Sequence, residues 1–166
     1  MAAGSLAIAG VSTIGDYVWA TSIPGHRMVY GLIHGTVLFL ALGLFLGVVS
    51  GRPAAGAIGA AVAGVLGAGL YYLLAPAIGF SAMFVAWFAV WIAFAVLYGR
   101  LQGGGADTGA ILSRGVVAAT ASGFAFYLIS GIWRPFNPQG LDYLVHFGAW
   151  TAAYLPGFGA LLLSRR

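Results

Sequence analysis

Long apolar runs separated by short polar breaks constrain the fold of this chain more than any other feature. Five runs reach or exceed the length of about 20 residues that an α-helix needs to cross a bilayer. They cover residues 28–50, 53–77, 80–101, 108–132 and 142–163. Because a segment in lipid must satisfy its backbone hydrogen bonds internally, runs of this length predict transmembrane helices.

The composition excludes an ordinary soluble protein. Charged residues make up 6% of the 166 residues, and the mean hydropathy is +1.00. A soluble domain carries about 25% charged residues, because its surface must face water. We therefore predict an integral membrane protein of the all-α class. A single transmembrane domain, residues 1–166, would form a polytopic helical bundle in contact with the lipid bilayer.

A sixth span over residues 2–20 would bring the bundle to about six helices, or five if this segment does not span. The segment is short, and Asp16 lies near its end. An internal similarity favours it, because residues 15–35 and 130–148 each contain a Trp, a Pro-containing turn and a helix with a His. One register aligns His34 with His146. A chance match between apolar segments is the alternative.

The arginines predict the orientation, because basic residues are retained in cytoplasmic loops. Five of the seven fall on one side of the alternating layout, namely Arg52, Arg100, Arg114, Arg165 and Arg166. Arg27 and Arg134 fall on the other side. We expect a cytoplasmic C-terminus and a location in a prokaryotic inner membrane. The arginines are scattered and form no patch, so nucleic acid is not an expected partner despite a pI near 9.8.

Two helices have contrasting surfaces. The helix from Pro53 repeats Gly or Ala every four residues, which allows close approach of a neighbour and predicts a place at the bundle centre. The helix over 80–101 carries an aromatic stripe. Its rings are expected to fill the groove of the glycine-rich neighbour or to meet lipid; the alternative is a stacking surface for a porphyrin, carotenoid or quinone. The remaining rings are expected at the outer membrane boundary: Trp19, Trp133, Trp150, Tyr17, Tyr30 and Tyr143.

Scarce polar groups gather towards the outer end of the predicted bundle. All three histidines and two of the three acids map there. Ionisable groups inside a membrane are costly, so they tend to face the bundle interior and to be paired. His146 follows Asp142 by four residues and is expected to hydrogen-bond to it. The predicted ligand-binding residues are Tyr30, His34, Asp142, His146, His26, Arg27, Asp16, Tyr143 and Trp133.

Several functions fit this cluster. The preferred hypothesis is a polar pocket near the outer face that binds a small molecule or ion, relays protons, or transports its ligand. The structural alternative is an accessory subunit of a larger membrane complex, or of a homo-oligomer, with no ligand of its own. A divalent metal site or a haem held by His34 and His146 is a third hypothesis. No catalytic motif is present, so an enzyme is not favoured.

Overall fold

The computed structural model describes residues 1–22, 27–103, 105, 107–133 and 139–163, without the side chains of 19, 22, 27 and 128–133. Within this part the chain forms helices and no strand. The elements are α1 (Ala2–Ser22), α2 (Arg27–Val49), α3 (Pro53–Ile78), the 3-10 helix η1 (Gly79–Ser81), α4 (Ala82–Leu101), α5 (Thr108–Trp133) and α6 (Asp142–Leu162).

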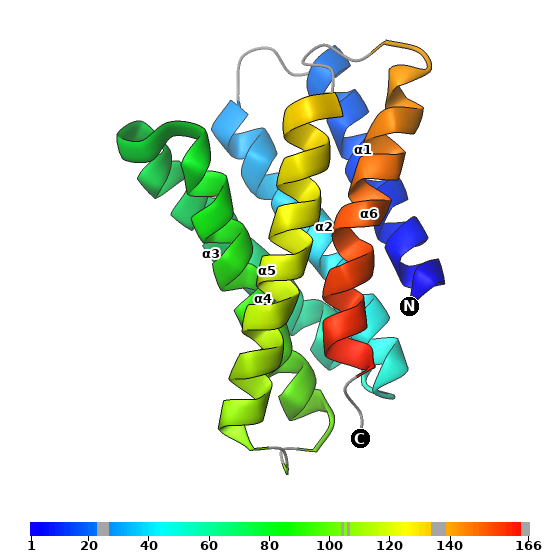
Figure 1. Cartoon of the computed structure of the whole chain (residues 1–166), viewed down its shortest axis with the longest axis vertical. Coiled ribbons are helices and arrows are strands. Elements are labelled where there is room, and N and C mark those ends of the chain that lie inside the picture. Colours follow the sequence, from blue (N-terminus) through cyan, green and yellow to red (C-terminus); the bar gives the residue numbers. More distant parts are fainter. Residues whose placement is uncertain (23–26, 104, 106, 134–138, 164–166) are drawn as a thin grey trace.

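The all-α prediction is confirmed, and each helix boundary lies within two residues of the predicted one. The N-terminal segment is helical as well. Three helical stretches of the described residues are long and apolar enough to cross a membrane: Met28–Val49, Pro53–Leu101 and Thr108–Tyr127. The second of these contains α3, η1 and α4, and it reverses direction at η1 (Figure 1).

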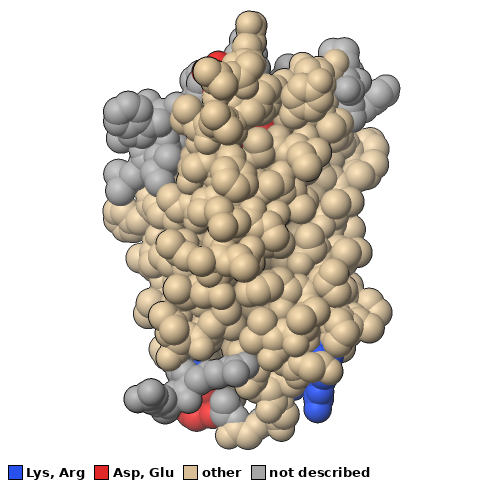
Figure 2. Space-filling model, turned by 90° about the vertical axis from the view of Figure 1, so that its right-hand side faces the viewer, with Lys and Arg blue, Asp and Glu red and all other residues tan. Residues whose placement is uncertain are grey.

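The helices run up and down along one common direction (Figure 1). The start of α1 and the end of α6 lie toward the same end as the connection from α2 to α3, the end of α4 and the start of α5. The first and last helices, α1 and α6, pack against each other, and α1 also contacts α2. On the face shown in Figure 2, charged side chains lie near the two ends, and the broad belt between them carries none among the described residues.

The helix at the centre of the bundle is α4, and the prediction that α3 is central was wrong. Among the described residues α4 contacts α2, α3, α5, α6 and η1, whereas α3 contacts only α2, α4 and η1. Only small residues of α3 are buried, namely Gly56, Ala60, Gly64 and Gly67. A repeat of small residues therefore marks one face of close contact and leaves the opposite face of the helix exposed.

That close contact joins α2 to α3. A Cβ atom built on Gly56 would lie 2.4 Å from the carbonyl oxygen of Gly43 and 2.6 Å from the Cα atom of Gly47. Both atoms belong to the backbone, so no side-chain movement could make room. The helices approach so closely here because neither carries a side chain at the contact.

The aromatic stripe of α4 supplies much of the core. Trp91 and Phe94 are at most 1% exposed, and Trp91 lies against Gly157 and Phe158 of α6. On the side of α4 that faces the glycines of α3, the contacting side chains are Val90 and Leu97 instead of the rings. The rings therefore pack inside the core with α2, α5 and α6 as their main partners, and the expectation that they fill the groove of the glycine-rich α3 was wrong.

Candidate functional site

Asp16 on α1 is the centre of a buried polar cluster. Its Oδ2 accepts a hydrogen bond from the indole Nε1–H of Trp150 at 2.8 Å and lies 2.9 Å from Nδ1 of His146. Both partners belong to α6 and lie four residues apart, so they project from the same face of that helix. The His146 side chain is 2% exposed and that of Asp16 17%. One carboxylate oxygen therefore joins the first helix of the chain to the last.

The carboxylate that pairs with His146 is Asp16, and the predicted pairing with Asp142 was wrong. Asp142 uses its Oδ2 to accept the backbone N–H of Gln139 at 3.0 Å, in the turn that leads into α6. The side chain thus satisfies a backbone donor at the start of a helix, where a carboxylate is also favoured by the helix dipole.

The second ring nitrogen of His146, Nε2, is buried and has no hydrogen-bond partner among the described residues. With the ionised Asp16 as acceptor, Nδ1 carries the proton of the hydrogen bond. Nε2 is therefore the polar atom of this cluster that the described residues leave without a hydrogen bond.

On the opposite side of Asp16, α2 contributes Tyr30 and His34. The Tyr30 hydroxyl donates a hydrogen bond to the carbonyl oxygen of Gly15, and its ring stacks on that of His34 with centroids 5.8 Å apart. His34 lies so close to Gly15 that a Cβ atom there would fall within 2.1 Å of Nδ1. A glycine directly before Asp16 allows the imidazole to pack against the α1 backbone.

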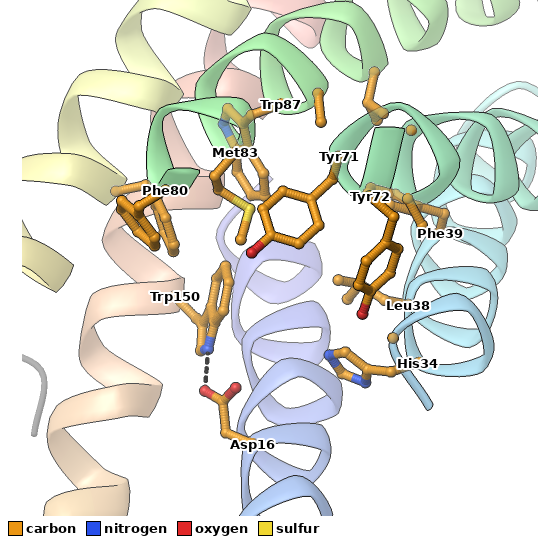
Figure 3. A pocket seen from close by; sticks show the side chains of 16 residues that line it. Asp16, His34, Leu38, Phe39, Tyr71, Tyr72, Phe80, Met83, Trp87 and Trp150 are labelled. Atoms are coloured by element: carbon orange, nitrogen blue, oxygen red, sulfur yellow. Dashed lines mark hydrogen bonds between the residues drawn. The ribbon is translucent and has the colours of Figure 1, made fainter. Parts of the chain in front are cut away.

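A cavity of about 360 Å³ opens beside Asp16 and His34 (Figure 3). Each of the helices α1 to α6 contributes to its wall, together with η1. The lining residues are Asp16, Gly31, His34, Leu38, Phe39, Gly67, Ala68, Tyr71, Tyr72, Phe80, Met83, Ala86, Trp87, Val90, Phe126 and Trp150. Pockets of this size and kind, mostly apolar with a few polar groups, are typical of small-molecule sites.

The polar groups of the cavity lie at one end of it. In Figure 3, Asp16 and His34 face each other across one end of the space, and the rings of Tyr71, Phe80, Trp87 and Trp150 surround the rest. Tyr72 extends between α2 and α3, where its hydroxyl lies over Gly31. The cavity thus combines a carboxylate and an imidazole with an aromatic wall.

Further polar contacts continue below Asp16. The hydroxyls of Ser12 and Tyr154 lie 3.0 Å apart. Ser12 lies one helical turn from Asp16 on α1, and Tyr154 lies one turn from Trp150 on α6. On α5, Ser122 accepts the indole N–H of Trp87 at 3.2 Å. Sequence reasoning missed these pairs and the role of Trp150. The matching four-residue spacings of 12/16 and 146/150/154 were the available signal.

The structure brings some of the predicted residues to this site and separates others. Asp16 and His34 line the cavity, and Tyr30 and His146 contact them. Tyr143 packs its ring against Tyr17 and His146 near the start of α6, outside the cavity wall. Asp142 is not among the lining residues, and the other three predictions, His26 and the side chains of Arg27 and Trp133, lie outside the described residues. Trp150, expected at the membrane boundary, is 7% exposed and lies in the core.

The described residues do not favour the metal hypothesis. No group of three or more His, Asp or Glu side chains in the described part of the chain is arranged to hold a metal ion. Of the two proposed ligands, only His34 lines the cavity, and His146 uses Nδ1 to bind Asp16. The two imidazoles therefore do not share one open space, as ligands of a common haem or metal would.

Comparison with known proteins adds no relative. No protein-family model, no curated protein and no solved structure matches this chain.

Proposed function

We propose that this chain is a six-span membrane protein that binds a small molecule in the cavity beside Asp16 and His34. The observation that carries the proposal is the convergence of all the helices on one cavity that has a charged group at one end. Transport of the bound molecule would extend the same function, since the cavity lies inside the proposed membrane domain.

The lengths of the helices support six spans. The shortest, α4, has 20 residues, which corresponds to roughly 30 Å, the thickness of the hydrocarbon core. The polar residues that lower the hydropathy of α1 and α6 are buried against each other, as for Ser12, His146 and Tyr154. Polar groups that are paired inside the bundle do not face lipid, so they do not prevent these helices from spanning.

The outward faces of the helices also suit lipid. On α2 the exposed large apolar residues follow one another at spacings of three and four, and they are Val29, Ile33, Val37, Leu40, Leu44 and Val48. Such a stripe along a whole helix would be unfavourable in water. With Arg52 and Arg100 at the end that holds the start of α1 and the end of α6, we place that end in the cytoplasm and the Asp16 end at the outer face.

Photolabelling tests the occupancy of the cavity and does not require the identity of the natural ligand. The protein is placed in lipid nanodiscs and irradiated with a neutral phenyldiazirine alcohol. We expect saturable labelling of cavity residues such as Met83 and Tyr71, with competition by unlabelled phenylbutanol. Labelling confined to lipid-facing residues such as Leu73, with no competition, would contradict the proposal.

A variant that fills the cavity provides the matched test. Met83→Trp adds a large ring to the lining and is expected to lower the saturable labelling at least about fivefold, since a filled pocket cannot bury the probe. Leu73→Trp, at a lipid-facing position of α3 that is 75% exposed, should leave labelling unchanged. If both variants fold and neither changes the labelling, the polar cluster is better explained as a structural contact in an accessory subunit.

A further inference from the structure

We propose that the ligand of this cavity is an organic cation, a lipophilic ammonium whose positive charge is balanced by the Asp16 carboxylate. This inference rests on the proposed function, because it names the class of molecule for the same cavity. It depends on three features of the site: the charge of the Asp16 carboxylate, the chemistry of the cavity wall, and the geometry of the second carboxylate oxygen.

The first feature is the negative charge of the Asp16 carboxylate in the cavity wall. Among the described residues that line the cavity, Asp16 is the only acid and none is an Arg or Lys. The hydrogen bonds to Oδ2 involve the indole of Trp150 and the imidazole of His146. The described wall of the cavity therefore carries an acidic group and no Arg or Lys to balance it.

This charge discriminates between classes of ligand. An anion would be repelled by Asp16 at short range in a medium of low dielectric constant. A neutral molecule would displace water from the carboxylate without replacing the lost solvation. A cation balances the charge of the carboxylate. Burial makes an unpaired carboxylate unfavourable, and the same burial strengthens the attraction between the carboxylate and a bound cation.

The second feature is the aromatic wall. Seven of the lining residues are aromatic, and they are Phe39, Tyr71, Tyr72, Phe80, Trp87, Phe126 and Trp150. The faces of such rings attract cations, and cages of this type recognise ammonium groups. The same rings, with Leu38, Met83 and Val90, can bury the apolar part of the molecule. A small inorganic ion would leave this wall unused, so an organic cation fits the cavity better.

The third feature is the position of the second carboxylate oxygen. Oδ2 of Asp16 is engaged with α6, and Figure 3 shows the other oxygen on the side of the carboxylate that faces His34. An ammonium N–H placed between them can donate a charge-assisted hydrogen bond to Oδ1. His34 lines the same cavity and stacks on Tyr30, and a neutral imidazole there can accept a second N–H.

The test compares three probes of nearly equal shape and different charge. Phenylbutylammonium, phenylbutanol and phenylbutyrate are each measured by equilibrium dialysis against the protein in nanodiscs, with empty nanodiscs subtracted. We expect the cation to bind at least about tenfold more tightly than the alcohol, and the anion to show no saturable binding. This comparison uses the unmodified protein, so it does not depend on any variant folding.

Asp16→Asn then assigns the preference to one residue. Asparagine keeps the shape and removes the charge, so we expect the preference for the cation over the alcohol to be lost. Asp107→Asn, which changes a carboxylate at the opposite end of the molecule, is the matched control and should keep the preference for the cation.

The outcomes separate this inference from the proposed function. If the alcohol binds as tightly as the cation, or if Asp16→Asn keeps the preference, the inference is overturned while a ligand-binding cavity remains. If phenylbutylammonium shows no saturable binding but the photoreactive alcohol still labels Met83, the inference fails alone. If neither probe occupies the cavity, both proposals fail.

Discussion

Asp16 has a structural role at the level of the single residue, independent of any ligand. One of its oxygens accepts hydrogen bonds from Trp150 and His146, so two donors of α6 depend on one acceptor of α1. His146 and Trp150 are both buried, so water cannot easily reach them to replace the Asp16 carboxylate as acceptor. The residue should therefore contribute more to stability than the other two acids of the chain.

Asp16→Leu is expected to lower the free energy of unfolding by about 1–3 kcal/mol for each donor left without an acceptor. Unfolding by SDS titration in mixed micelles measures the loss. Trp150→Phe, which removes one donor and keeps a ring, should cost less than Asp16→Leu. An Asp16→Leu protein that unfolds at the same SDS fraction as the unmodified protein would contradict this role.

The sequence predicted which polar residues gather at one end, but it did not predict which of them pair. The four-residue spacing of Asp142 and His146 is a local rule, and Asp142 instead satisfies a backbone N–H in the preceding turn. The actual partner, Asp16, lies 130 positions away in the chain. That pairing depends on α1 and α6 being neighbours, which no local pattern contains.

At the level of the helix, boundaries could be predicted and neighbours could not. The helices begin and end where Pro, Gly and polar residues interrupt the apolar runs, as at Gly51 and Pro53, where Gly51 has a φ of 71° that disfavours other residues. The central position of α4 could not be predicted in the same way. Its large rings can fill a core or face lipid equally well, and only the arrangement of the other helices decides.

The contact between α2 and α3 offers a prediction with a control on the same helix. Gly56→Ala is expected to destabilise the protein by several kcal/mol, because the new methyl group would meet the backbone of Gly43 and Gly47. Gly69→Ala, where nothing lies within 4 Å, should be neutral or stabilise α3 by up to about 1 kcal/mol. SDS unfolding of both variants provides the measurement, and equal effects would show that the close contact is not important for stability.

At the level of the whole molecule, the cavity was predicted only in outline. Its place towards the end with the histidines and two acids follows from the clustering of scarce polar residues in the sequence. Its wall does not, because Tyr71, Phe80 and Trp87 reach it only through the crossing of α3 and α4 with the other helices. The cavity is the space that remains between the packed helices. Their packing depends on contacts between segments that lie far apart in the sequence.

The proposed six spans can be tested by labelling, and the absence of Cys provides a clean background. Single variants Ala3→Cys, Gln102→Cys and Leu141→Cys each place a thiol at an exposed position. We expect a membrane-impermeant maleimide added outside cells to label Leu141→Cys and to label the other two only after permeabilisation. If Ala3→Cys is labelled from outside like Leu141→Cys, α1 does not span and the topology has five spans.

The seam between α1 and α6 has a consequence for biosynthesis. Helix α1 leaves the ribosome with a carboxylate and a serine hydroxyl whose side-chain partners are on α6, which is made later. Until those partners arrive, a solitary Asp16 in the hydrocarbon would be costly. If α1 spans the membrane, it should therefore settle late, held near the headgroups or the insertion machinery, and its integration should wait for α6.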